Sequence, residues 1–224
     1  MISDKLLNKR KSLLMVASSL GISAQDLAFS YPDEVFTTHL TKSLVQQAFR
    51  LHIDDFTADR LNAVCNIPFN RDVRTPVEYA IDLIYGWLVE DIVYEFLLQN
   101  GFDVQKTGSD RNREFMSSGK IKSDLDLSVD GKPFDVYFDA QGYWKKNNKI
   151  DIRESKWREL EKNQASIICV SAQGFALIDY SSDHSLESNA AWGGKKCVTI
   201  NGIGDKLGSP ELLVSTIKGT SSIY

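Results

Sequence analysis

The chain is poor in the residues that mark disulfide-rich, zinc-binding and histidine-dependent proteins. Its three cysteines, Cys65, Cys169 and Cys197, are odd in number and too widely spaced for a disulfide framework or a zinc site. The three histidines show no metal-ligand spacing. Cys169 lies in the apolar run 166–170, which is typical of a buried strand. We therefore expect a protein of the reducing cytoplasm whose mechanism does not rest on histidine.

A long apolar run and a global positive charge are also missing. The apolar stretch 13–17 follows the basic triplet 9–11 but is too short to cross a bilayer, so no membrane association is expected. The formal net charge is -4, which lacks the overall basic signature of nucleic-acid binding. Locally the charge differs, because residues 105–123 carry five basic against two acidic side chains, and residues 142–162 carry seven against four.

Residues 124–139 are rich in acids and read as two strands joined by a turn. Alternate residues of a strand point to opposite faces, so Asp124 and Asp126 share one face. The pair Asp130 and Gly131 is a hairpin turn signal, and folding there brings the end with Asp124 and Asp126 beside Asp139. Such carboxylates repel one another unless a cation or a proton lies between them. The segment predicts a divalent-metal site, and the alternative is a surface hairpin with solvated acids.

A helix is predicted immediately before this hairpin. Residues 75–78, Thr-Pro-Val-Glu, form a capping box with proline at the first helical position. Apolar residues follow at helical spacing as far as Asn100 and Gly101, which are a stop signal. The chain then passes into a short strand that begins near Phe102. We expect the order helix, strand, acidic hairpin.

This order resembles the PD-(D/E)xK nucleases, which include type II restriction endonucleases, Holliday-junction resolvases and Mrr-like enzymes. The matching pattern is a Gly-x-x-x-Glu helix ending in Leu-x-x-x-Gly-aromatic, a strand, and then two adjoining strands with an Asp and a further acid, over about residues 76–180. By this resemblance Glu90 is the helix glutamate, Asp126 the first aspartate and Asp139 the second acid. Asp124 is similar to the additional acid of Mrr-like segments.

The resemblance breaks at the position where the family has lysine, because this chain has Gln141. In the family the lysine is taken to orient the attacking water and to stabilise developing negative charge. Glutamine keeps the hydrogen-bonding ability but carries no charge. Lys156, on the helix expected over residues 151–163, and Lys122 are the candidates for a substitute cation. A third possibility is that catalysis has been lost.

The fold class that the resemblance implies is α/β, with a restriction-endonuclease-like mixed sheet flanked by helices. The strand 166–170 is expected to run parallel to the second strand of the hairpin, through a right-handed crossover. We expect residues 1–74 to be a helical region that packs on the core or contacts DNA. Residues 75–224 would be the nuclease-like domain, and further on the sequence predicts a strand at 197–200 and a helix at 210–217.

The predicted function is a Mg²⁺-dependent DNA endonuclease, with Mn²⁺ as a possible substitute. Asp126, Asp139, Glu90 and Asp124 would hold the metal, while Gln141 and Lys156 would complete the catalytic set. Contacts to DNA phosphates are expected from basic side chains that flank the hairpin: Lys120, Lys122, Lys145, Lys146, Lys149 and Arg153. The alternative is that these residues are ordinary charged side chains in contact with solvent and do not bind DNA.

Within the nucleases we favour a sequence-specific restriction enzyme that acts as a homodimer. A structure-specific resolvase or a phage-type nuclease is the runner-up. A hypothesis of another class is a nuclease-like fold without catalysis that binds DNA or another protein. The weakest alternative is a protein unrelated to nucleic acids in which the acidic hairpin is fortuitous.

Overall fold

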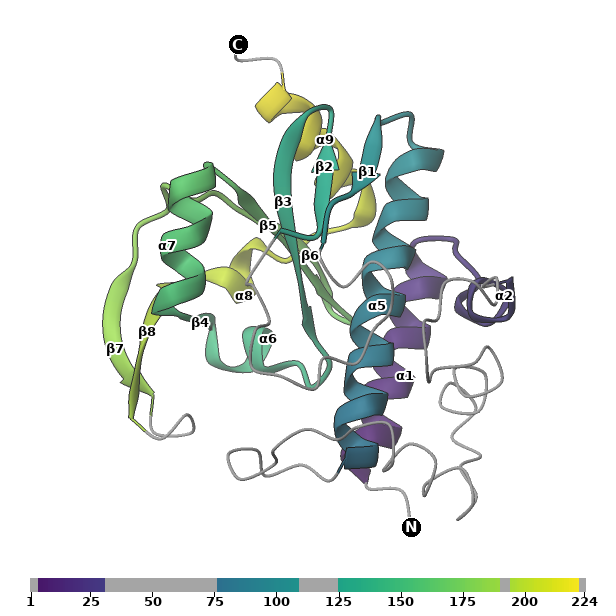
Figure 1. Ribbon diagram of the computed structural model, residues 1–224, viewed down its shortest axis with the longest axis horizontal. Helices are drawn as coiled ribbons and strands as arrows, with labels where there is room; N and C mark the ends of the chain where they lie inside the picture. Colours follow the sequence, from purple (N-terminus) through teal and green to yellow (C-terminus); the bar gives the residue numbers. More distant parts are fainter. Residues whose placement is uncertain (1–3, 31–75, 109–124, 190–193, 222–224) are drawn as a thin grey trace. The chain divides into compact units, whose positions relative to one another are not determined.

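The structure, a computed structural model, describes residues 4–30, 76–108, 125–189 and 194–221 (Figure 1). It is a mixed α/β arrangement, so the general fold class is confirmed. The described chain divides into two compact units. One unit contains residues 1–95 and 108–122, and the other contains residues 96–107 and 123–224. The expected division at residue 74 falls outside the described residues and stays a prediction.

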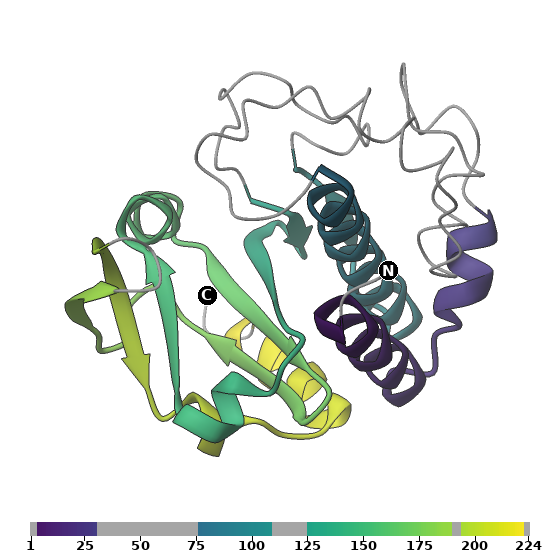
Figure 2. The same ribbon diagram turned by 90° about the horizontal axis from the view of Figure 1, so that it is seen from below.

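The N-terminal unit contains α1 (Asp4–Ser19), α2 (Ala24–Ser30) and most of α5 (Pro76–Gln99). Figure 2 shows α1 lying alongside α5, and an ion pair of 2.9 Å between Lys9 Nζ and Asp82 Oδ1 joins them. Leu13 and Tyr85 are fully buried within this unit. The described beginning of the chain, residues 4–30, contains the two helices α1 and α2.

The helix α5 begins at the predicted Pro76 and ends at the predicted stop. Gly101 follows it with a φ of 85°, a conformation that favours glycine. The N–H of Phe102 reaches back to the carbonyl of Leu97 at 3.2 Å, which satisfies one of the last helical carbonyls. The chain then enters the first strand of the second unit. No helix in the described ranges combines the length and apolarity that a membrane crossing requires.

The second unit contains two sheets. The first, called sheet A, has five strands: β1 (Val104–Lys106), β2 (Leu127–Val129), β3 (Lys132–Asp139), β5 (Ser166–Ser171) and β6 (Gly174–Ile178). Their spatial order is β1-β2-β3-β5-β6. All neighbours are antiparallel except β3 and β5, which are parallel. The predicted hairpin and the predicted parallel partner of its second strand are therefore confirmed.

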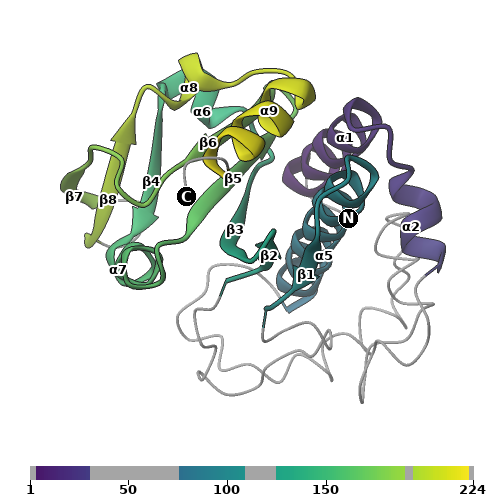
Figure 3. The ribbon, with the colours of Figure 1, turned by 90° about the horizontal axis from the view of Figure 1, so that it is seen from above.

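The second sheet, called sheet B, has three strands: β4 (Lys149–Arg153), β8 (Lys195–Asn201) and β7 (Ser185–Asn189), in that order. Its central strand β8 contains the predicted strand 197–200. The remaining elements are helices: α6 (Tyr143–Asn147), α7 (Glu154–Asn163), α8 (Ile203–Lys206) and α9 (Pro210–Ser221). The last of these contains the predicted helix 210–217 and packs against β6 (Figure 3).

The expected helix 151–163 is wrong at its start. Lys149–Arg153 is the strand β4, and the helix α7 begins only at Glu154. Residues 149–153 alternate polar and apolar side chains, and both apolar members, Ile150 and Ile152, are buried. This period of two suits a strand with one covered face.

The core of the second unit lies between sheet A, sheet B and α7. Trp157 and Leu160 of α7 meet Ile152 of β4 and Cys169 of β5 in this buried cluster. Trp144 of α6 also belongs to it, so both tryptophans are packing residues. Because side chains alternate along β3, Asp135, Tyr137 and Asp139 project to the face of sheet A that carries this cluster. Lys132 and Phe134 project to the opposite face.

Candidate functional site

The register of the acidic hairpin decides which carboxylates meet. Leu127 pairs with Phe134 across β2 and β3, so Asp126 stands opposite Asp135. The turn residues Asp130 and Gly131 both have positive φ, 48° and 78°, which is the backbone of a tight two-residue hairpin. Asp139 lies four residues beyond Asp135, about 13 Å along the strand. The hairpin thus differs from the expected arrangement, in which Asp139 neighbours Asp126.

Asp126 and Asp135 form a hydrogen-bonded carboxyl pair. Asp126 Oδ2 also accepts from the backbone N–H of Val136 at 2.8 Å, which orients its side chain along β3. Asp135 is 2% exposed. Its Oδ2 is buried and lies 3.2 Å from Lys156 Nζ. A carboxylate oxygen can accept from more than one partner, and carboxylates are suitable ligands for a hard cation.

Lys156 provides the positive charge beside this pair. It lies in the first half of α7, and its Nζ forms an ion pair with Asp135 Oδ2 at 3.2 Å. The burial of Trp157 in the core holds α7 against sheet B. The Lys156 side chain is itself only 16% exposed. The structure therefore brings together two of the predicted site residues, Asp126 and Lys156, through a third that the sequence interpretation did not select.

The electrostatics of Asp135 reflect its burial. Desolvation raises the pKa of the Asp135 carboxyl above its ordinary value, while the hydrogen bond from Asp126 and the Lys156 ammonium act in the opposite direction. Two carboxylates in contact cannot both ionise freely without a proton or a cation between them. Lys156 supplies part of the positive charge that this pair requires.

Tyr137 is the residue two positions after Asp135, on the same face of β3. Burial and the nearby Asp135 and Asp126 charges raise the Tyr137 pKa well above its ordinary value. The phenol therefore stays protonated at neutral pH and can serve as a hydrogen-bond donor. Relative to Asp135 it occupies the position that the motif assigns to lysine.

Asp139 has a different role in the structure. Its Oδ1 accepts from the backbone N–H of Gln141 at 3.0 Å, and its Oδ2 accepts from the N–H of Trp144 at 2.8 Å. Both oxygens thus hold the turn that leads from β3 into α6. The carboxylate is buried, with 6% exposed. Gln141 is exposed, and its backbone is part of this cap.

The predicted DNA-binding residues that the structure describes lie on and around α6 and β4. Lys145 Nζ donates to the carbonyl of Gly204 at 3.0 Å, and Lys149 Nζ lies 3.5 Å from Asp151 Oδ2. Lys146 and Arg153 are exposed. Lys120, Lys122 and Asp124 lie outside the described residues. Contact of any of these residues with DNA stays a prediction.

Glu90 lies on α5, in the N-terminal unit, and is partly exposed. Its role beside the hairpin carboxylates stays a prediction. In the part of the chain that the structure describes, no three His, Cys, Asp or Glu side chains lie close enough to hold a metal ion. Asp126 and Asp135 together supply two carboxylates, the number that Mg²⁺ commonly takes from a protein before waters and substrate phosphate complete its shell.

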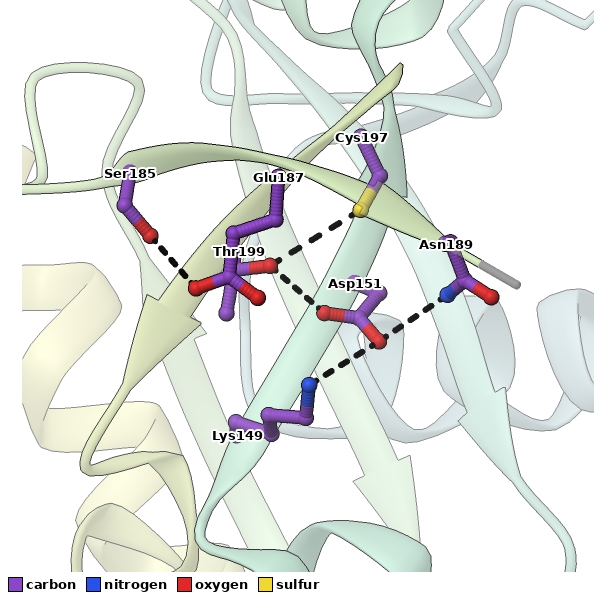
Figure 4. Close-up of polar contacts among 7 residues, drawn as sticks. All are labelled: Lys149, Asp151, Ser185, Glu187, Asn189, Cys197 and Thr199. Atoms are coloured by element: carbon purple, nitrogen blue, oxygen red, sulfur yellow. Dashed lines mark hydrogen bonds and ion pairs between the residues drawn. The ribbon is translucent and has the colours of Figure 1, made fainter. Parts of the chain in front are cut away.

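A second polar cluster lies on sheet B and spans its three strands (Figure 4). Asp151 is its centre: Oδ1 accepts from Thr199 Oγ1 at 2.7 Å, and Oδ2 accepts from Asn189 Nδ2 at 3.1 Å. Lys149 completes the set as an ion pair. Each oxygen of Asp151 thus has a partner within the sheet, so this cluster is a structural cross-link.

The sequence contained one signal for Asp135. The second strand carries two acids on one face, and counting outward from the turn at Asp130 and Gly131 pairs Asp126 with Asp135. Choosing the acid at the far end of the strand gives Asp139 instead.

No protein-family model matches the chain, no curated protein matches it, and no solved structure matches it.

Proposed function

We propose that the chain is a metal-dependent nuclease that hydrolyses DNA phosphodiester bonds at a site centred on Asp126, Asp135 and Lys156. One observation carries the proposal. A carboxyl pair at the β2–β3 hairpin, with one buried oxygen, meets a lysine from α7. Acids and a cation at one point are the groups that phosphoryl chemistry requires.

The order of elements supports the same proposal. The helix α5, the antiparallel strands β1, β2 and β3, the helix α7 and the parallel strand β5 follow one another as the resemblance to the PD-(D/E)xK nucleases implies. The short helix α6 and the strand β4 are additions between β3 and α7. In this proposal Asp135 takes the place of the second acid, and the lysine comes from α7.

The residues of the site have separable roles. Asp126 and Asp135 would hold a Mg²⁺ or Mn²⁺ ion, and Glu90 and Asp124 stay the predicted further ligands. Such an ion, when bound, polarises the phosphate and lowers the pKa of a coordinated water. Lys156 neutralises negative charge that develops on the phosphoryl oxygens. Tyr137 keeps its proton and can donate a hydrogen bond, and Gln141 stays the predicted water-orienting residue.

The test is cleavage of supercoiled plasmid and of a four-way DNA junction by the full chain, with Mg²⁺, with Mn²⁺ and with EDTA. We expect metal-dependent cutting that EDTA abolishes and that Asp126→Asn and Asp135→Asn each remove. Asp183→Asn, at an exposed aspartate away from the pair, is the matched control and should cut normally. Cutting that survives both substitutions in the carboxyl pair rejects the proposed site.

The same assay distinguishes a restriction enzyme from a resolvase. Fragments with fixed ends identify a restriction enzyme, for which we expect a homodimer, and preference for the junction identifies a resolvase. The second candidate function is a DNA-binding module without catalysis, which the exposed Gln141 in place of lysine favours. That module would bind DNA in a gel-shift assay and leave every substrate intact.

A further inference from the structure

A cavity of about 540 Å³ lies at one end of sheet A. Four chain segments line it: the start of β3, the end of α7, the start of β5 and the residues that follow β6. All four belong to the second unit. Its volume is within the range of about 300–1,000 Å³ that is usual for small-molecule sites. No residue of the proposed nuclease site lines this cavity.

One wall of the cavity carries a carboxylate that is already held in place. Asp179 Oδ1 accepts from the backbone N–H of Ser181 at 2.9 Å and also from the Ser181 hydroxyl, and Asp179 Oδ2 accepts from Ser166 Oγ at 3.3 Å. A carboxylate has about four acceptor positions. Asp179 is therefore oriented before a ligand arrives and keeps capacity for a further donor.

The remaining lining combines one cation with amides and ring surfaces. Lys132 contributes an ammonium, and Gln164 contributes an amide from the left-handed residue that ends α7. Tyr180 contributes the accessible aromatic ring, and Phe134, which is 3% exposed, lies beneath the lining. An aromatic ring with placed polar groups can hold a ring-bearing small molecule.

We infer that this cavity binds a nucleoside monophosphate, either free or as the end of a nucleic-acid strand. The ring would lie against Tyr180, with its hydroxyl or amino donors directed to Asp179. The phosphate would pair with Lys132. One lysine together with a carboxylate suits a single phosphate, because a polyphosphate would bring excess negative charge close to Asp179.

The inference is independent of the proposed nuclease activity. Lys132 and Phe134 project from the face of sheet A opposite to Asp135, and Ser166 pairs with Phe134 on that same face. Asp126, Asp135 and Lys156 do not line the cavity, so the two sites would be separate. Binding in the cavity can be measured without metal, and its outcome does not depend on whether the chain cuts DNA.

The experiment is isothermal titration of the full chain, in EDTA, with 5′-AMP, adenosine, inorganic phosphate and a 5′-phosphorylated dinucleotide. We expect 5′-AMP to bind more tightly than adenosine or phosphate. Lys132→Gln should weaken 5′-AMP about tenfold, as the loss of one charge-assisted hydrogen bond does, and leave adenosine unchanged. Asp179→Asn should weaken adenosine and 5′-AMP alike. The matched control is Lys195→Gln, at an exposed lysine of sheet B.

Circular dichroism and a thermal melt establish that each variant is folded before titration. Tighter binding of the dinucleotide than of 5′-AMP assigns the cavity to a strand end, and the reverse assigns it to a free nucleotide. Absence of 5′-AMP binding at millimolar concentration overturns the inference. Equal binding of 5′-AMP by Lys132→Gln and by the wild type overturns it as well.

Discussion

Asp135 and Asp139 are buried on the same face of the same strand, four residues apart, and their partners differ in kind. Backbone amides of one local turn occupy both oxygens of Asp139. Asp135 meets side chains from two other elements, Asp126 before β2 and Lys156 on α7. A backbone amide is fixed by the fold and cannot turn toward another acceptor, whereas side chains can rearrange around a ligand. Burial of a carboxylate therefore does not by itself identify a site, and the mobility of its partners is the more useful criterion.

The largest effect is expected on the rate of DNA cleavage, where substitution of Asp135 and substitution of Asp139 should differ. We expect Asp135→Asn to lower metal-dependent DNA cleavage by about 100-fold or more, because it removes a charged ligand that stabilises the transition state. Asp139→Asn keeps one oxygen acceptor and should retain most activity in its folded fraction. Initial rates of plasmid cleavage measure both. If Asp139→Asn is the inactive variant, the comparison is reversed and the sequence interpretation of the second acid stands.

The next effect concerns stability, and Asp139 should dominate it. Asp139→Ala leaves the N–H groups of Gln141 and Trp144 without their acceptor, which should cost about 3 kcal/mol. Urea denaturation followed by tryptophan fluorescence measures the loss. Asp183→Ala is the control at an exposed aspartate and should change stability little. A loss for Asp139→Ala no larger than this control would mean that the cap contributes nothing.

Substitution of Asp135 should raise the stability of the chain, whereas substitution of Asp139 lowers it, and the size of the gain should depend on pH. Its pKa is raised in the folded state above the ordinary 3.8, so the folded chain binds this proton more tightly than the unfolded chain. Its contribution to stability is complete below pH 3.8 and is lost as the pH rises through the raised folded pKa. Asp135→Asn removes this loss and should be more stable than the wild type at neutral pH.

The advantage of Asp135→Asn should shrink as the pH falls and should vanish below 3.8, where the wild-type carboxyl is protonated in both states. Thermal melts between pH 3.5 and pH 8, in buffers without divalent metal, measure this dependence. A variant that is less stable than the wild type at neutral pH would show that the ion pair with Lys156 outweighs burial.

The smallest effect is expected in sheet B, where Asp151 also has side-chain partners. Thr199→Val removes the hydroxyl that donates to Asp151 and should cost about 1 kcal/mol without altering cleavage. The same denaturation and plasmid assays test it. Loss of cleavage in a folded Thr199→Val protein would show that side-chain partners alone do not distinguish the Asp135 site from the Asp151 cluster.

Many of the helices and strands were predictable, because their signals are local. The proline start and glycine stop of α5, the turn at Asp130 and Gly131 and the apolar run of β5 each follow from a few neighbouring residues. The strand β4 was missed because a polar and apolar alternation over five residues next to a helix was read as part of that helix. The general sheet pairing followed once these elements were in place.

The candidate site was less accessible to sequence reasoning. Asp126 and Lys156 were expected, but Asp135 was not, because the choice between two acids on one strand depends on the pairing register. The capping role of Asp139 depends on where the chain turns after β3 to begin α6, and no local pattern indicates that turn. The charge state of Asp135 depends on burial beneath α7, which is a tertiary property.

The two-residue turn at Asp130 and Gly131 has a chemical consequence that its own side chains do not reveal. A three-residue loop at the same place would move β3 by one position and set Val136, an apolar residue, opposite Asp126. The positive φ of Gly131 thus selects which side chain becomes the neighbour of Asp126, although Gly131 contacts neither. Backbone conformation at one residue therefore helps to determine which side chains could act as ligands.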